Sequence, residues 1–197
     1  MRLDEVLAAW QGCLDPAPLD QARGGVALCV DLSRDGRHAT VAAAQIMPDG
    51  RARVELLADL AGPTAASNLE RVLPALLLAV KPRVLGWFPN GPAAAVAAKL
   101  AKAPAGVTVT EIRGDTPAVV MGFAKEVAAV TLAHSGDPLL DAHVLGAEKL
   151  DSGGGWVFSR RGGEHADAAY AAAGAVHLAR TVPRAPKYSK RVHVPAG

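Results

Sequence analysis

The chain has 197 residues, of which 50% are hydrophobic and 20% are charged, so it can build the core of one globular domain. It contains no apolar run of about 18 residues, which excludes a transmembrane helix, and its two cysteines exclude a disulfide framework. The N-terminal segment carries acids where a signal peptide has a basic start and an apolar core, so we expect a cytoplasmic protein.

The net charge of +2 is unevenly distributed along the chain. Residues 180–197 hold five of the 21 lysines and arginines and none of the 19 acids, which leaves 16 basic against 19 acidic residues, or −3, in the rest. This tail is also rich in proline, and we expect it to be extended and flexible. A basic tail can contact a phosphate backbone, and a solvated C-terminus is an equally good interpretation.

The first predicted elements are a short helix and three strands. The helix covers residues 3–12 and is followed by a linker with two prolines and a glycine pair. The strands cover residues 25–31, 38–47 and 51–59, and the turns between them, SRDGR and PDG, carry the Asp-Gly pair that is typical of hairpins. Strands joined by such tight turns are antiparallel neighbours.

Helices and strands alternate in the rest of the chain. Residues 64–80 place apolar side chains on one face at helical spacing. The later predicted elements are a strand at 81–88, a helix at 91–102, a strand at 106–112, a helix at 114–132, a helix within 137–150, a strand within 152–163 and a last helix at 165–180. Crossover helices imply that the later strands of the sheet are parallel additions. This order predicts an α/β protein with the ribonuclease-H-like fold, a mixed five-stranded sheet with helices on both faces.

Two carboxylates lie where this fold can bring them together. Asp31 ends the apolar run 26–30 on a charge, which is costly unless something pairs with it. It either begins a polar turn or holds a metal ion at the carboxyl end of a central strand. Asp167 lies in the first turn of the last, alanine-rich helix, where an acid also complements the helix dipole. We predict that both acids bind Mg²⁺ or Mn²⁺, which prefer oxygen ligands and activate water for phosphodiester hydrolysis.

Five segments of the chain carry a resemblance to a known family. They are VALCVDLSRDGRHATVAAA, VLGWFPNGPAAAVAAKL, LAHSGDPLLDAHVLGAEK, GGWVFSRR and HADAAYAAAGAVHLA. In this order they resemble the C-terminal nuclease domain of the large terminase subunit of tailed bacteriophages, and are most similar to actinobacteriophage sequences. The likeness covers about residues 25–180 and implies that Asp31 and Asp167 are catalytic. The chain would then divide into an N-terminal helix and linker (1–23), the nuclease domain (24–180) and a basic tail (181–197).

The chain departs from the family pattern at two points. The family's packaging ATPase has a phosphate-binding loop, and no Gly-x-x-x-x-Gly-Lys followed by Ser or Thr occurs here, so we expect any ATPase to lie outside this chain. The family also has an acid at the end of the fourth strand, where this chain has Phe88, with Asn90 as the nearest oxygen donor. Glu70 or Glu55 could substitute for that acid, and Glu70 is preferred because Glu55 lies two strands from the centre.

Basic residues near the end of the chain are candidates for contact with DNA. They are Arg160, Arg161, Lys149, Lys187, Lys190 and Arg191. Arginine suits phosphate contacts, although a surface pair can also be merely solvated. Trp156 either stacks on a base or is a buried aromatic. His165 could orient substrate or water, and His134 could lie near the site. The alternative interpretation is an ordinary surface histidine for His165 and an ordinary turn histidine for His134.

These observations predict a metal-dependent endonuclease that cuts concatemeric, double-stranded viral DNA during genome packaging. The resemblance implies a packaging ATPase domain, a small terminase subunit and a portal as partners, and no membrane. Two other functions stay open. A non-catalytic module that binds DNA or the portal is favoured by the missing acid, and a junction resolvase-like nuclease shares the fold.

Overall fold

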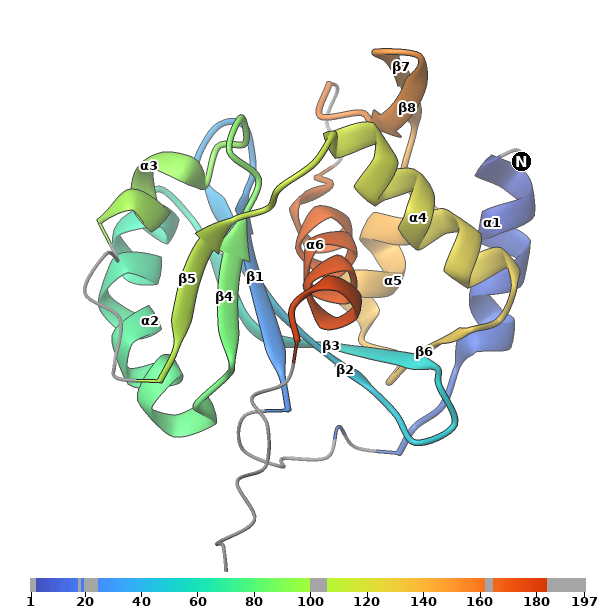
Figure 1. The fold of residues 1–197 in the computed structure, drawn as a ribbon. Coiled ribbons are helices and arrows are strands. Elements are labelled where there is room, and N and C mark those ends of the chain that lie inside the picture. Colours follow the sequence, from blue (N-terminus) through green and yellow to red (C-terminus); the bar gives the residue numbers. More distant parts are fainter. Residues whose placement is uncertain (1–2, 18, 20–24, 100–105, 162–164, 184–197) are drawn as a thin grey trace, which may run out of the picture.

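A six-stranded mixed sheet between two layers of helices forms the framework of the protein (Figure 1). The computed structural model describes residues 3–17, 19, 25–99, 106–161 and 165–183. None of the helices in these ranges is long and apolar enough to cross a membrane. The predicted α/β architecture, with a mixed sheet and helices on both faces, is confirmed.

The strands lie in the order β5-β4-β1-β2-β3-β6, so β1 is central, as predicted. They are β1 (Ala27–Leu32), β2 (His38–Ile46), β3 (Ala52–Ala61), β4 (Val84–Trp87), β5 (Thr108–Glu111) and β6 (Leu132–His134). A separate hairpin consists of β7 (Lys149–Ser152) and β8 (Gly155–Phe158). The helices are α1 (Leu3–Trp10), the 3-10 turn η1 (Gln11–Cys13), α2 (Ala65–Val80), α3 (Ala94–Ala98), α4 (Thr116–Ala128), α5 (Pro138–Leu145) and α6 (Asp167–Thr181). Strand β1 is antiparallel to β2 and parallel to β4.

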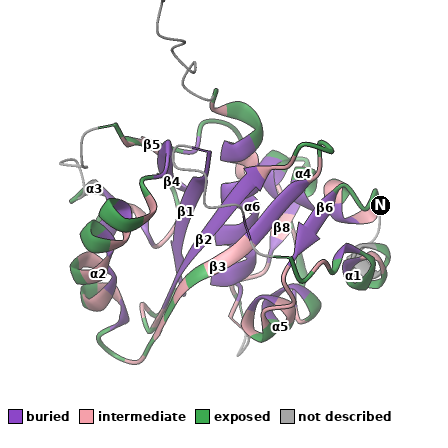
Figure 2. Ribbon diagram, turned by 90° about the horizontal axis from the view of Figure 1, so that it is seen from below, coloured by how far each residue is buried: buried purple, intermediate pink, exposed green. Residues whose placement is uncertain are grey.

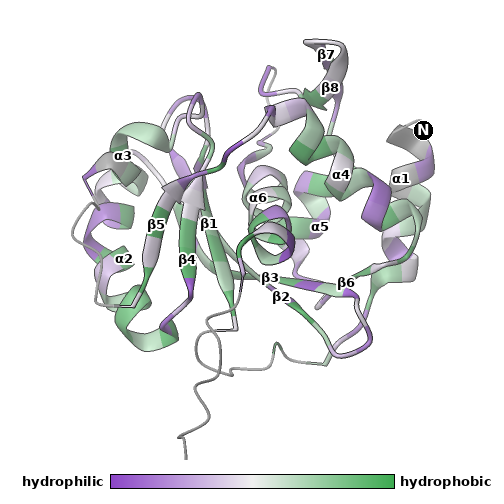
Figure 3. Cartoon of the chain, in the orientation of Figure 1, coloured by the Kyte–Doolittle hydropathy of each residue, from purple (hydrophilic) through white to green (hydrophobic). Residues whose placement is uncertain are grey.

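Side chains alternate between the two faces of the sheet along β1, so this strand contributes residues to both hydrophobic cores. Every residue of the strand is buried, and β1 and β4 are largely hydrophobic (Figures 2 and 3). Ala27 and Cys29 join the core beneath α6, while Leu28 and Val30 join the core beneath α2. The sheet therefore has α6, α4, α5 and α1 on one face and α2 and α3 on the other.

Small residues let α6 lie directly on the centre of the sheet. Its sequence, DAAYAAAGAVHLART, is buried over most of its length. A Cβ atom on Gly174 would collide with Cys29 Sγ and lie 2.8 Å from Ile112 Cδ1. The helix thus packs against β1 at a distance that only glycine permits at this position.

The sheet has one strand more than the five predicted. Residues 114–132 were expected to be a single helix, but α4 ends at Ala128 and Val130 adopts a positive φ of 53°. The chain then turns back, and Leu132–His134 pair in parallel with Ala52–Val54 of β3. A short apolar run continuous with a helical pattern hid this strand, because only its pairing with β3 distinguishes it from a last helical turn.

The N-terminal segment packs into the core beneath α6 rather than standing apart from it. Trp10 is fully buried, and its indole N–H donates to Asp141 Oδ1 at 2.8 Å. The ring of His134 stacks on the Trp10 ring at a centroid distance of 3.8 Å. The division of the chain at residue 23 stays a prediction, and most of the predicted tail, residues 184–197, lies outside the described residues.

The close packing of α6 predicts that Gly174→Ala destabilises the protein by about 1–3 kcal/mol, because the added methyl group overpacks the contact with Cys29 and Ile112. Gly122→Ala is the matched control, since Gly122 lies in α4 with nothing within 4 Å of an added Cβ. That change should stabilise the protein by up to about 1 kcal/mol through helix propensity. Urea denaturation measures both, and equal effects of the two changes would contradict the packing argument.

Candidate active site

Asp31 lies at the carboxyl end of β1 with a fully buried side chain. Because residues alternate along a strand, its side chain shares the face of Ala27 and Cys29, beneath α6. Its cross-strand partner in β2 is Thr40. The turn after β4 lies beside it, since a Cβ on Gly91 would be 3.5 Å from Asp31 Oδ1.

Asp167 is the first residue of α6 and is also fully buried. The Thr40 hydroxyl donates a short hydrogen bond to Asp167 Oδ2. Thr40 therefore links the two acids, because it pairs with Asp31 in the sheet and binds Asp167 through its side chain. The structure brings Asp31 and Asp167 to one end of the sheet, as the sequence predicted.

Burial governs the electrostatics of Asp31. It raises the pKa of this carboxyl from 3.8 to about 7; the positive charge of Arg160 opposes that rise, and the negative charge of Asp167 adds to it. Arg160 Nη2 lies 2.6 Å from Asp31 Oδ2 in an ion pair whose arginine side chain is only 19% exposed. The carboxylate of the pair is thus removed from water, while the arginine keeps a small exposed surface.

Two further contacts hold Arg160 in place, and one of its partners, Tyr170, is itself anchored. Its Nη1 donates to the carbonyl oxygen of Leu32 at 2.9 Å. Its guanidinium carbon lies 3.7 Å from the centre of the Tyr170 ring, a cation–π contact. The Tyr170 hydroxyl donates to the Phe158 carbonyl at 2.7 Å, and the Phe88 ring packs edge-on against Tyr170. Arg160 is therefore fixed between the end of β1 and an aromatic surface formed by Tyr170 of α6 and by Phe88, which follows β4.

His143 of α5 supports Asp167 from the other side. Its Nδ1 accepts the backbone N–H of Ala168 at 3.1 Å and lies 3.9 Å from Asp167 Oδ1. Burial lowers the pKa of His143, against the opposing effect of the Asp167 charge. A neutral ring with a free Nδ1 lone pair is the form that can accept this bond, so His143 fixes the first turn of α6 and with it the Asp167 side chain.

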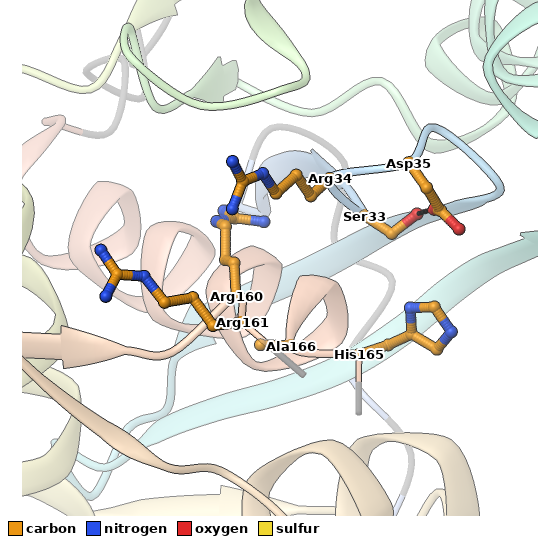
Figure 4. Close-up of a pocket in the computed structure, with 7 residues that line it drawn as sticks. All are labelled: Ser33, Arg34, Asp35, Arg160, Arg161, His165 and Ala166. Atoms are coloured by element: carbon orange, nitrogen blue, oxygen red, sulfur yellow. Dashed lines mark hydrogen bonds between the residues drawn. The ribbon is translucent and has the colours of Figure 1, made fainter. Parts of the chain in front are cut away.

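An open pocket of about 490 Å³ lies next to the two acids. It is lined by Ser33, Arg34, Asp35, Arg160, Arg161, His165 and Ala166 (Figure 4). These residues come from the β1–β2 turn and from the segment between β8 and α6, and three of them are arginines. The side chains of Arg160 and Arg161 point in different directions, and only Arg160 reaches the end of β1. A pocket of this charge suits a phosphate group.

The two acids fit a divalent ion through their oxygens. Both carboxylate oxygens of Asp31 and Oδ1 of Asp167 are buried and have no hydrogen-bond partner with good geometry among the described residues, and only Asp31 Oδ2 has a close cation, Arg160. Burying such oxygens without a partner costs free energy in the metal-free protein, and carboxylate oxygens are ligands suited to Mg²⁺ or Mn²⁺. No cluster of three or more His, Cys, Asp or Glu residues that could hold a metal ion occurs in the described ranges. The protein thus offers two carboxylates, and other ligands would be water or substrate.

The structure does not bring Glu70 or Glu55 to the two acids, which corrects the sequence-based suggestion that either could substitute for the missing acid. Helix α2 covers the opposite face of the sheet, and Glu70 forms an ion pair with Lys99 at 2.7 Å. Glu55 pairs in register with Ala43, on the same opposite face, and binds Arg53 at 3.1 Å. Sequence spacing alone does not tell which face of the sheet a helix covers.

Phe88 and Asn90 lie in the turn after β4, close to Asp31. Phe88 is buried, and Asn90 is exposed one residue before Gly91. The ring of Phe88 packs against Tyr170 where the family pattern has an acid. A role for Asn90 as a weak ligand stays a prediction.

Other candidate residues lie partly inside and partly outside the site. His165 lines the pocket, and its ring lies 3.8 Å from that of His38. His134 is not near the site. It is the last residue of β6, the edge strand, where its ring stacks on Trp10. Trp156 is buried, which favours the core interpretation, and Lys149 lies 5.7 Å from the centre of its ring. Lys187, Lys190 and Arg191 lie outside the described residues.

Four residues that complete the site were not identified from the sequence. Thr40 could have been found from the register of the first hairpin, and Arg34 from its place in the SRDGR turn. His143 and Tyr170 gave no local signal, because their roles depend on the packing of α5 and β8 against α6.

No protein-family model and no curated protein sequence matches this chain. Its fold, however, is that of a class of viral enzymes, the nuclease domains of phage large terminases. The large terminase of bacteriophage HK97 is similar with a TM-score of 0.65 and 13% identity over 87% of this chain. This chain spans only 42% of the length of that protein.

Two isolated nuclease domains are similar over nearly their whole length. The large terminase nuclease of thermophilic phage G20c has a TM-score of 0.59 and 15% identity, covering 87% of this chain and 96% of its own. A mutant nuclease domain of the large terminase subunit gp2 of bacterial virus Sf6, with manganese, has a TM-score of 0.61 and 13% identity, covering 93% of this chain and 100% of its own. Other structures of the G20c nuclease contain magnesium or cobalt. The predicted resemblance to the terminase nuclease domain is confirmed for the fold.

The raised pKa of Asp31 predicts an unusual pH dependence of stability in the metal-free protein. A carboxyl with a pKa of about 7 in the folded state and about 3.8 in the unfolded state binds its proton more tightly when folded. Its contribution to stability is therefore present below about pH 4 and is lost as pH rises towards 7. The free energy of unfolding should fall by up to about 1.4 kcal/mol per pH unit in this window relative to Asp31→Asn. Urea denaturation in EDTA measures this difference, and parallel pH profiles for the two proteins would contradict it.

Proposed function

We propose that this chain is a metal-dependent DNA endonuclease domain that cuts concatemeric viral double-stranded DNA during genome packaging. The observation that carries the proposal is the pair of fully buried carboxylates, Asp31 and Asp167, each with an oxygen that lacks a hydrogen-bond partner. The arginine-lined pocket beside them supports a phosphodiester as substrate. The fold shared with terminase nuclease domains supports the same assignment.

Asp31 and Asp167 would hold Mg²⁺ or Mn²⁺ through their carboxylate groups. The bound ion supplies an activated water and neutralises charge on the phosphate. Thr40 and His143 hold Asp167 in the orientation that its role requires. The metals in the related nuclease structures support the choice of a divalent ion.

The arginines around the pocket would position the DNA backbone. Arg160 would meet the phosphate nearest the acids, while Arg34 and Arg161 would contact neighbouring phosphates. Contacts of this kind carry little sequence information, so we expect weakly sequence-specific cleavage. The predicted contacts of Lys149 and of the basic tail with DNA would extend this surface.

The packaging role places the chain among several partners. By analogy with the large terminases whose fold it shares, it would work with a packaging ATPase domain, a small terminase subunit and the portal, in the cytoplasm of the host. This part of the proposal rests on the fold and on the sequence resemblance, and the catalytic part rests on the site.

One observation favours the alternative of a non-catalytic packaging module. Asp31 is already neutralised by Arg160, and the described residues contain no third acid beside the two carboxylates that would form a metal-binding cluster. A domain of this kind would bind DNA through the arginine pocket without cutting it. Cleavage assays distinguish the two functions directly.

We expect Asp31→Asn and Asp167→Asn each to reduce Mn²⁺-dependent linearisation of supercoiled plasmid by at least about 100-fold, because one neutral ligand cannot replace a central carboxylate. Glu70→Gln is the matched control, since Glu70 lies on the opposite face of the sheet and pairs with Lys99. That variant should retain cleavage. Full activity of Asp31→Asn would rule out this mechanism, and no cleavage by the unmodified chain at any metal concentration would favour the non-catalytic module.

Binding to DNA should depend on the arginines of the pocket. Arg34→Gln and Arg161→Gln should each reduce the slope of log K against log salt concentration by about 0.9, the value for one lost phosphate contact on duplex DNA. Lys81→Gln is the control, because Lys81 follows α2 at the opposite end of β4 from the site. Fluorescence anisotropy in EDTA with a labelled duplex gives the slopes. If all three variants keep the slope of the unmodified chain, the pocket does not bind DNA.

A further inference from the structure

Arg160 occupies the space next to the central carboxylate in a way that limits how many cations the site can take. Its Nη2 is 2.6 Å from Asp31 Oδ2 in an ion pair, so Oδ1 is the oxygen of Asp31 that does not face the guanidinium. A guanidinium group stays charged at any physiological pH, so this cation is permanent. One side of Asp31 is therefore already occupied by positive charge.

The contacts of Arg160 make it a fixed part of the site. Its Nη1 donates to the Leu32 carbonyl, and one face of the guanidinium packs against the Tyr170 ring. Tyr170 is itself anchored by its hydroxyl on the Phe158 carbonyl and by the edge of the Phe88 ring. The aromatic surface thus includes Phe88, which directly follows β4 and offers no carboxylate to recruit an ion.

The sum of the charges in the site also limits the number of cations that it can bind. The buried groups are Asp31 and Asp167, with two negative charges, and Arg160, with one positive charge. One divalent ion would bring the sum to +1, and two would bring it to +3. Asp35 and Asp59, the other acids in this region, are exposed, and Asp35 accepts hydrogen bonds within its own turn. A buried site cannot accommodate so large an excess of charge without more carboxylates.

We propose that the site binds a single divalent ion, which Asp31 and Asp167 would hold, and that Arg160 takes the place of a second cation. This inference rests on the proposed function, since it assumes that the two acids bind a metal ion. Arg160 then keeps its contacts with Asp31 and the Leu32 carbonyl, and its other N–H groups can donate to a phosphate oxygen in the complex with DNA. The arginine supplies positive charge next to the phosphate without a second set of carboxylate ligands.

Binding of Mn²⁺ to the whole chain in the absence of DNA tests this arrangement. Isothermal titration calorimetry at pH 8, with electron paramagnetic resonance to count bound Mn²⁺, should give one ion per chain. Arg160→Gln should tighten Mn²⁺ binding by at least about tenfold, because removal of an adjacent positive charge frees both oxygens of Asp31. Arg161→Gln is the matched control, because it makes the same charge change one residue further on. The Arg161 side chain points away from that of Arg160 (Figure 4), and the ion pair of Asp31 is with Arg160. The Mn²⁺ affinity of Arg161→Gln should stay within about twofold of the unmodified chain.

Two ions bound by the unmodified chain would overturn the proposal, as would equal Mn²⁺ affinities of the Arg160 and Arg161 variants. Arg160→Lys keeps the charge and should still give one ion, and circular dichroism shows whether each variant is folded. If Arg160→Gln does not fold, the ion count of the unmodified chain and of Arg160→Lys decides the question. Asp31→Asn separates this inference from the proposed function. Loss of Mn²⁺ binding in that variant supports the metal site even if Arg160 proves irrelevant, whereas unaltered binding overturns both.

Discussion

Asp31 and Asp167 bring two like charges into a region from which water is excluded, and such a pair is costly unless the surrounding structure compensates for it. The compensation comes from three directions. Thr40 donates to Asp167, Arg160 pairs with Asp31, and His143 fixes the turn of α6 that carries Asp167. Strand β2, the segment after β8 and helix α5 must therefore all pack correctly before the two carboxylates can be buried together.

The packing of α6 makes this arrangement possible. A helix built of alanine and glycine can lie directly on β1 and β2, and this brings its first residue to the end of the central strand. Bulky residues on α6 would hold it further from the sheet, and Asp167 would no longer reach Thr40. The unusual composition of the last helix thus serves the site as well as the core.

The site combines an acidic interior with a basic rim. The acids lie below the surface, while Arg34, Arg160 and Arg161 line the open pocket. A phosphodiester can reach such a site with its charge matched by the arginines and its reacting centre next to the carboxylates. Arg160 belongs to both layers, because it lines the pocket and pairs with Asp31. This dual position would link the proposed contact with DNA to the electrostatics of the acids.

The sequence by itself determined the order of elements, the central place of β1 and the two acids that lie at its end, because these follow from hydrophobic alternation, Asp-Gly turns and crossover connections. It could not determine that Leu132–His134 form a sixth strand, since only pairing with β3 distinguishes them from the end of α4. Nor could it place Glu70, because local spacing does not tell which face of the sheet α2 covers. The partners of the acids were likewise decided by tertiary structure. Thr40, His143 and Arg160 lie 127, 24 and 7 residues from Asp167 along the chain, and only the packing of α6 against the sheet brings all three to one site.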